Sequence, residues 1–289
     1  RMKKAKQRAL LRRDPTRTTM LQRRAMRAVR KRYACLRALV KALVVERDGF
    51  ALDKPKPSWM AMNQDFAFET NPLKVRRFRA WLRHQMTSTL SGDELLEKYI
   101  GEVYQRGATR AFRDLRRIDR ETVPDIPTLT PGDTSAAEEE QRWVRQRMSR
   151  GPTVEKVKLL AGRTFTEMED IDSKMATRMS RILTEALVNG WSTKKTAKEM
   201  MGQVDIEEKR ALTVVRTELI RAHAEGQLDV LAASGAQVRA SVEWDTAGDG
   251  NVCPRCAPND GKVFSVEDAR GLIPVHPNCR CAWVPVRPR

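Results

Sequence analysis

Hydrophobic positions recur at helical spacing over most of the chain. Between Thr153 and Asn189 they follow one another at intervals of three and four residues, which is typical of one face of a long helix and not of a strand. The same pattern predicts helices over Thr16–Val45 and over Pro72–Arg120, the latter in two pieces that meet near Ser91–Asp93. We therefore expect long helices to dominate the fold.

The segment that follows the longest helix predicts two shorter helices and then a strand. Ser192 is a good N-cap for a helix that runs to about Met201. A capping-box-like start at Asp205 predicts a separate helix that continues to about Ser234. Residues 238–244 then alternate between apolar and polar side chains, which indicates a strand.

Composition divides the chain into four consecutive regions. They are a basic helical region (1–120), a linker (121–152), a helical domain (153–237) and a small C-terminal module (238–289). The linker is predicted from Pro124, Pro127 and Pro131, followed by Ser, Thr and acidic residues, because such a stretch has few groups to bury. We expect it to be exposed.

Positive charge is concentrated in the first region. The chain has 55 Lys and Arg against 37 Asp and Glu, a net charge of +18, and residues 1–50 hold 17 of the cations and 3 of the anions. Nucleic acid most commonly supplies the counter-charge, and an anionic membrane surface or an acidic protein surface is the alternative. For the basic helix itself, a solvated helix docked on the rest of the protein is the simpler interpretation, and contact with nucleic acid or an acidic partner is the one we favour. The residues expected to contact DNA phosphates are Arg12, Arg13, Arg23, Arg24, Arg27, Arg30, Lys31 and Arg32.

Four of the five cysteines lie close together near the C-terminus, at a spacing typical of a metal site. Cys253-Pro254-Arg255-Cys256 places two thiolates on one tight turn, and His276-Pro277-Asn278-Cys279-Arg280-Cys281 adds one imidazole and two thiolates. Tetrahedral Zn²⁺ prefers such donors. The candidate ligands are Cys253, Cys256, His276, Cys279 and Cys281, one more than a closed site needs. Disulfides and free buried thiols are the alternatives.

The pattern favours a structural zinc over a catalytic one. A hydrolytic zinc needs an open coordination position, whereas four or five good ligands close the site. Asn259–Lys262 is a hairpin-turn signal, so zinc is expected to clamp a small hairpin that lacks a core of its own. The expected fold class is therefore mainly α (α+β), with long helices followed by a small C-terminal zinc-bound β-hairpin module.

One helical motif raises the question of catalysis. Arg216-Thr217-Glu218, with Arg221 on the same predicted helix, can be interpreted as part of a transferase active site. Side chains three and four apart on a helix face one another, so a salt-bridge cluster is the simpler interpretation. We expect no enzymatic activity. The alternative is a zinc-dependent nucleic-acid enzyme, either a nuclease or an ADP-ribosyltransferase-like protein.

The order of these motifs resembles the C-terminal domain of the phage head morphogenesis family, minor head proteins similar to the F protein of phage Mu. The resemblance runs over about Thr153–Val286. It rests on the helix with Arg216-Thr217-Glu218, on Trp244-Asp245, and above all on the paired Cys-Pro-x-Cys and His-Pro-x-Cys-Arg-Cys blocks.

The resemblance implies a structural minor capsid protein that is made in the host cytoplasm and resides in the virion, in the capsid interior. The implied partners are the portal protein and the capsid interior, and the implied role is to aid head assembly and DNA packaging or ejection. The positive charge favours non-specific DNA binding through phosphate contacts. No membrane partner is expected, because no run approaches the roughly 18 apolar residues that a span needs.

Overall fold

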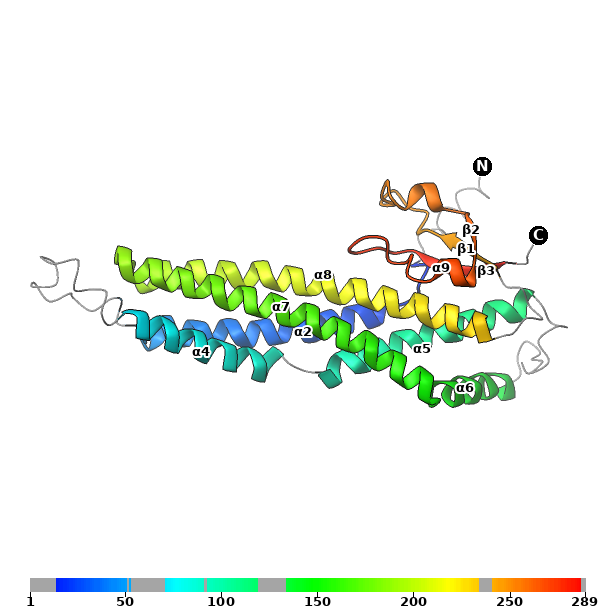
Figure 1. The fold of residues 1–289 in the computed structure, drawn as a ribbon, viewed down its shortest axis with the longest axis horizontal. Helices are drawn as coiled ribbons and strands as arrows, with labels where there is room; N and C mark the ends of the chain where they lie inside the picture. Colours follow the sequence, from blue (N-terminus) through cyan, green and yellow to red (C-terminus); the bar gives the residue numbers. More distant parts are fainter. Residues whose placement is uncertain are drawn as a thin grey trace, which may run out of the picture. The chain divides into compact units, whose positions relative to one another are not determined.

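A computed structural model describes residues 14–50, 52, 71–90, 93–118, 134–233 and 241–286. Within these residues the protein is mainly helical, with a small three-stranded sheet near the C-terminus (Figure 1). The helices are α2 (Thr19–Lys41), α4 (Asn71–Leu90), α5 (Asp93–Ile118), α6 (Thr134–Met148), α7 (Gly151–Asn189), α8 (Thr193–Ala233) and the short α9 (Val266–Ala269). The strands are β1 (Ser241–Asp245), β2 (Val263–Ser265) and β3 (Ala282–Val286).

The chain folds as two compact units drawn from interleaved segments. The first unit takes residues 1–25, 93–164 and 215–289, and the second takes residues 26–92 and 165–214. Helices α2, α7 and α8 each contribute to both units. The units therefore follow the packing of long helices, and the division into four consecutive regions stays a prediction.

Several predicted helices are confirmed with small shifts at their ends. α7 begins at Gly151, and α4 and α5 correspond to the two predicted pieces that meet near Ser91–Asp93. α2 begins at Thr19 because the Asp14 carboxylate accepts a hydrogen bond from the Thr19 backbone N–H at 2.7 Å. A π-helical turn, Ala42–Glu46, follows α2.

The separate helix predicted to begin at Asp205 is wrong, because α8 is continuous from Thr193 to Ala233. The acidic residues that suggested a capping box instead serve an ion pair with α2. Arg37 lies 3.0 Å from the Asp205 carboxylate and 2.5 Å from that of Glu208. The sequence alone does not distinguish an acidic N-cap from an acidic residue inside a helix that pairs with a distant base.

The predicted linker contains a helix. α6 lies within residues 121–152, and its Val144 is buried. Trp143 of α6 packs on Phe112 of α5, with ring centroids 4.4 Å apart. This aromatic contact holds α6 against α5, whereas the composition of residues 121–152 had predicted an exposed linker.

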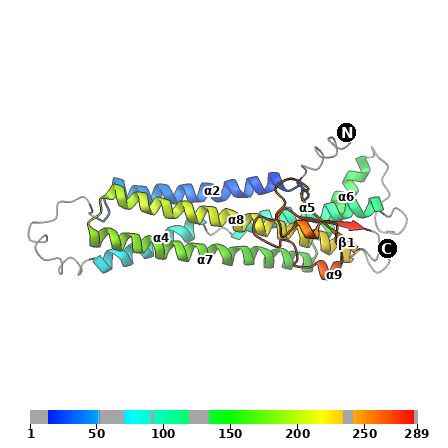
Figure 2. The same ribbon diagram turned by 90° about the horizontal axis from the view of Figure 1, so that it is seen from above.

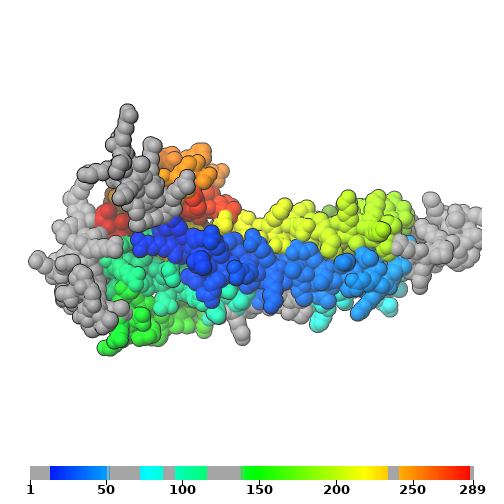
Figure 3. Space-filling model, turned by 180° about the vertical axis from the view of Figure 1, so that it is seen from behind, coloured from blue at the N-terminus to red at the C-terminus, as the bar shows by residue number. Residues whose placement is uncertain are grey.

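In the second unit, α4 packs with parts of α2, α7 and α8. Figure 2 shows α2 running alongside α8, and Figure 3 shows the same pair from another side. Arg178 of α7 and Arg210 of α8 both pair with the fully buried Glu207, at 2.6 and 3.0 Å. The apolar stripes form the core, whose fully buried residues include Leu36, Leu82, Met175, Met179, Leu183 and Met200.

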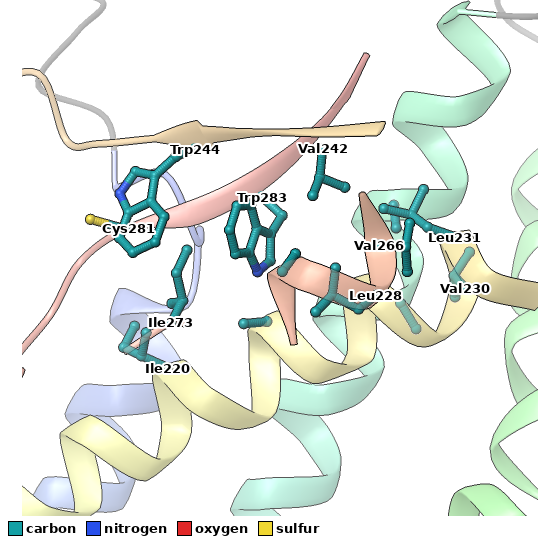
Figure 4. Packing of buried hydrophobic residues seen from close by; sticks show 14 of the residues in the cluster. Ile220, Leu228, Val230, Leu231, Val242, Trp244, Val266, Ile273, Cys281 and Trp283 are labelled. Atoms are coloured by element: carbon teal, nitrogen blue, oxygen red, sulfur yellow. The ribbon is translucent and has the colours of Figure 1, made fainter. Parts of the chain in front are cut away.

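In the first unit, the antiparallel sheet has the order β2-β1-β3 and packs on α5 and α8. Trp244 of β1 and Trp283 of β3 are paired in register and lie edge to face, with ring centroids 5.2 Å apart. Figure 4 shows both indoles above Leu228 and Ile220 of α8. The module has no separate core of its own, as expected, because its aromatic residues share one core with the helices.

Candidate metal centre

Two loops next to the sheet carry the five candidate metal ligands. Cys253 and Cys256 lie between β1 and β2, and His276, Cys279 and Cys281 lie between α9 and β3. Because β1 pairs with both β2 and β3, the sheet holds the two loops beside one another. The sequence prediction that these five residues meet is confirmed at the level of a cluster that could hold a metal ion.

Each loop presents its ligands on a tight turn of the same design. The Cys256 backbone N–H donates to the Cys253 carbonyl at 3.0 Å, and the Cys279 backbone N–H donates to the His276 carbonyl at 3.2 Å. Both turns have proline as their second residue. In the second turn Asn278 adopts a positive φ of 61°, which asparagine tolerates better than most residues. Each turn thus directs its first and fourth side chains to one point.

The distances define a compact cluster centred on Cys256. The His276 Nε2 atom lies 3.0 Å from the Cys253 sulfur and 3.1 Å from the Cys256 sulfur. The Cys256 and Cys279 sulfurs are 3.9 Å apart. Ligand atoms fall within 4.8 Å of one another in two overlapping sets, Cys253/Cys256/His276 and Cys256/Cys279/Cys281. Cys256 belongs to both.

The imidazole orientation suits metal binding. The His276 Nδ1 atom lies 2.7 Å from the Pro277 carbonyl oxygen. With its proton on Nδ1, the ring donates to this carbonyl and leaves the Nε2 lone pair facing the sulfurs, an arrangement that metal-binding histidines commonly adopt.

The buried sulfurs differ in their affinity for protons. A hydrogen bond from the Cys281 thiol lowers the pKa of Cys279 to about 5. Burial raises the pKa of Cys256 to about 12, and the negative charge on Cys279 acts in the same direction. The cluster therefore stabilises one thiolate at Cys279, and a bound cation would be needed to stabilise further thiolates beside it.

Two contacts that the sequence analysis missed brace the loops. Arg280 places two guanidinium nitrogens 2.6 Å from the two oxygens of Asp249, which joins the His276–Cys281 loop to the loop that carries Cys253. Thr217 of α8 accepts a hydrogen bond from the Asn278 backbone N–H at 3.1 Å. The only sequence signal for the first contact was an acid and a base that flank cysteines.

The Arg-Thr-Glu motif is a salt-bridge cluster, as its helical spacing predicted. The buried Glu218 carboxylate lies 3.1 Å from Arg221 on the same helix and 3.4 Å from Arg163 of α7. Its neighbour Thr217 is the residue that binds the metal loop. The motif therefore joins α7, α8 and the candidate metal centre.

The basic residues predicted to contact DNA lie mostly on α2. Arg12 and Arg13 fall outside the described residues, and Arg32 is half-buried. Arg23, Arg24, Arg27, Arg30 and Lys31 are exposed. Their contact with DNA stays a prediction.

Comparison with known proteins finds a family match over the C-terminal part of the chain. Residues 177–284 match the model of the family described as phage Mu protein F like protein, a segment that includes α8, most of the sheet and all five candidate ligands. Over this segment the match supports the resemblance to phage head morphogenesis proteins and agrees with a role in forming the phage head. The match is narrower than the predicted Thr153–Val286. No curated protein and no solved structure matches the chain.

Across the helices that the structure describes, none combines the length and the apolar character required to cross a membrane.

Proposed function

We propose that the protein is a structural minor capsid protein, bound at the portal vertex inside the phage head, that aids head assembly and DNA packaging or ejection. The family match over residues 177–284 carries this proposal. The portal protein and the capsid interior are its proposed partners, and packaged DNA is bound through phosphate contacts. A net charge of +18 supports the DNA contact, because such a chain gains from a polyanion nearby.

We further propose that the metal centre holds a structural Zn²⁺. Zn–S bonds of about 2.3 Å and Zn–N bonds of about 2.0–2.1 Å, at a tetrahedral angle, separate two sulfurs by about 3.8 Å and a sulfur from a nitrogen by about 3.6 Å. The Cys256–Cys279 separation of 3.9 Å fits the first value. The sulfur–nitrogen distances of 3.0 and 3.1 Å are shorter than the second, so His276 would move outward slightly on binding.

Cys281 is the proposed spare residue among the five. Cys253, Cys256, His276 and Cys279 occupy the first and fourth positions of the two matching turns. Cys281 directly precedes β3, and Figure 4 shows its sulfur beside the Trp244 ring. Its thiol donates to the Cys279 sulfur, which is what a group just outside the coordination sphere does.

The ligand set and the salt-bridge cluster support a structural role over an enzymatic one. Four protein ligands leave no open position on a tetrahedral zinc for a water or a substrate. Glu218, the acid that a transferase would use, is buried and engaged by Arg163 and Arg221. A zinc-dependent nuclease or transferase would instead need an accessible acid beside an open site.

Purified phage particles provide the test of the head-protein proposal. The protein should be detected by mass spectrometry in the particles at a few copies per head, and protease should degrade it only after the heads are opened. Particles made without it should show fewer filled heads or reduced infectivity, and the wild-type gene supplied in trans should restore both.

Other outcomes would contradict the proposed role, the proposed location or the absence of enzymatic activity. Absence of the protein from wild-type particles, together with normal filled heads when its gene is removed, would contradict the proposal. Co-purification with the portal protein tests the location, and loss of that complex from detergent-treated heads would argue against the portal vertex. Nuclease or transferase activity that Glu218→Gln abolishes in a folded variant would favour the enzyme.

A further inference from the structure

A basic cleft lies in the first unit between the start of α2 and helix α5. Its volume is about 470 Å³. Arginines make up five of its eleven lining residues, and Glu102 and Asp114 are the only acids among them. Figure 3 shows the start of α2, in dark blue, against the green of α5 on the face in view. The cleft is thus an electropositive hollow distinct from the metal centre.

The five arginines differ in how far carboxylates neutralise them. Arg113 is paired with Glu140, with its closest contact at 2.6 Å, and Arg24 lies 3.5 Å from Glu102. Neither Arg17 nor Arg106 has a carboxylate partner among the described residues, and both are exposed. Apart from the Arg106 Nη1 donor, which reaches the Arg17 carbonyl, the donors of these two guanidinium groups are left for a ligand.

Arg110 also lines the cleft, but carboxylates partly neutralise it. Its guanidinium lies 3.3 Å from Asp114 and 3.7 Å from Asp245, and its Nη1 is buried without a hydrogen-bond partner among the described residues. Because this atom is inaccessible to solvent, Arg110 contributes charge to the cleft and not a donor that a ligand can reach.

The local backbone holds Arg17 in place at the rim of the cleft. The Asp14 carboxylate caps α2, and the Arg17 backbone N–H donates to the Asp14 carbonyl at 3.0 Å. Arg17 adopts a positive φ of 52°, and its carbonyl lies 3.5 Å from Arg106 Nη1. The turn before α2 thus places the Arg17 backbone beside the Arg106 guanidinium, and both residues line the same cleft although they are far apart in the sequence.

The positive charge of the cleft reaches into the interior of the unit. Burial lowers the pKa of the fully buried His223 to about 3, and the positive charge of Arg110, followed by that of Arg106, acts in the same direction. His223 is therefore neutral in the folded protein and adds no positive charge to that of the arginines.

We infer that this cleft binds a phosphate of the DNA backbone, with Arg17 and Arg106 as its donors and Arg110 adding positive charge to the lining. The inference rests on the proposed DNA contact and gives it a location. Planar guanidinium groups match the oxygens of a phosphate in two-pronged hydrogen bonds. Because such contacts carry no base information, binding is independent of sequence.

The test compares two double variants of the full chain by titration of a labelled DNA duplex of about 20 base pairs over a series of salt concentrations. Arg17→Gln/Arg106→Gln removes two cleft donors. Arg142→Gln/Arg145→Gln removes two exposed arginines of α6 in the same unit, neither of which lines the cleft. Each phosphate contact changes the slope of log affinity against log salt by about one, so the cleft variant should lose about two from the slope and at least tenfold in affinity.

The control variant should lose less than half as much, and scrambled duplexes should bind alike. If the wild type binds DNA and the two double variants are indistinguishable, the cleft is not the DNA site, while the proposed DNA contact stands. If the wild type binds no duplex, the proposed DNA contact fails as well. A parallel titration with polyglutamate, in which the cleft variant loses binding to polyglutamate but not to DNA, would assign the cleft to an acidic protein surface and overturn the inference.

Discussion

The Gln227 side chain of α8 forms two hydrogen bonds with the backbone of Trp283 on β3. Gln227 Nε2 donates to the Trp283 carbonyl at 2.6 Å, and the Trp283 N–H donates to Gln227 Oε1 at 3.2 Å. β3 is an edge strand whose other side pairs with β1. At Trp283, the buried Gln227 amide therefore binds the backbone N–H and C=O that a further strand would otherwise bind. It also links α8 to the sheet beside the candidate metal centre.

Gln227→Met should destabilise the protein by about 2–4 kcal/mol. The substitution keeps the volume but leaves a buried N–H and a buried C=O without partners, each of which costs about 1–3 kcal/mol. Denaturant unfolding followed by tryptophan fluorescence measures the loss. Gln146→Met, on the exposed face of α6, is the matched control and should change stability by less than about 0.5 kcal/mol. Equal midpoints for the two variants would contradict the role given to Gln227.

Two glycines set the distance between α5 and α8. A Cβ atom at Gly107 would lie 2.1 Å from the His223 carbonyl oxygen, and one at Gly226 would lie 2.2 Å from the Tyr104 carbonyl oxygen. Both contacts are with backbone, which cannot move aside as a flexible side chain does. The two helices therefore approach closely enough that only hydrogen fits at either position.

Gly226→Ala should cost about 2 kcal/mol or more, because the helices must separate and lose packing. Alanine alone would stabilise the helix by about 0.8–1.0 kcal/mol relative to glycine. A loss of stability in Gly226→Ala would therefore show that the close helix contact outweighs helix propensity. Gly202→Ala on the same helix is the control, since nothing lies within 4 Å of its added Cβ, and it should stabilise the protein. Thermal unfolding measures both. A stabilising Gly226→Ala would mean that the helices do not approach as described.

The sequence predicted what local spacing determines. Three- and four-residue intervals predicted α7, and the paired Cys-Pro-x-Cys and His-Pro-x-Cys turns predicted the residues that cluster at the candidate metal centre. The missed features depend on distant partners. Asp205 has the form of a helix cap, and only Arg37, 168 positions away, shows that it is not one. Arg17 and Arg106, 89 positions apart, form part of one cleft that no linear run of charge predicts.

Purified protein should contain about one zinc per chain. Cys253→Ser and Cys279→Ser should each abolish metal binding, whereas Cys281→Ser should retain the metal with weaker affinity, because its thiol is proposed to act on Cys279 and not on the ion. Cys35→Ser, at an exposed cysteine on α2, is the control and should keep the full content. Elemental analysis measures all four.

Absence of zinc from the wild type, with the thiols free or paired as disulfides, would contradict the zinc proposal. Loss of the metal in Cys281→Ser, with retention in Cys279→Ser, would exchange the roles of these two cysteines. Loss in Cys35→Ser would show that the metal is bound elsewhere in the chain.

In the second unit, Asp172 of α7 carries a carboxyl group that burial makes hard to ionise. Its Oδ1 atom is buried without a hydrogen-bond partner among the described residues, and so is the Tyr33 hydroxyl. Burial raises the pKa of Asp172 to about 7, and the negative charges of Glu169 and Glu207 act in the same direction. The folded state therefore holds a proton that the unfolded chain, with an ordinary carboxyl pKa of 3.8, has already released.

Because the folded-state pKa of Asp172 is the higher one, its contribution to stability is fully present below about pH 3.8 and is lost as the pH rises from there to about 7. Asp172→Asn removes the ionisation, so its stability relative to the wild type should be greater at about pH 8 than at about pH 5, by on the order of 1–2 kcal/mol after allowance for solvent screening. Urea unfolding at the two pH values measures the difference. Asp170→Asn, at an exposed position of the same helix, should differ from the wild type equally at both. An Asp172→Asn difference that does not grow between these pH values would show that the carboxyl group is ionised in the folded protein throughout this range.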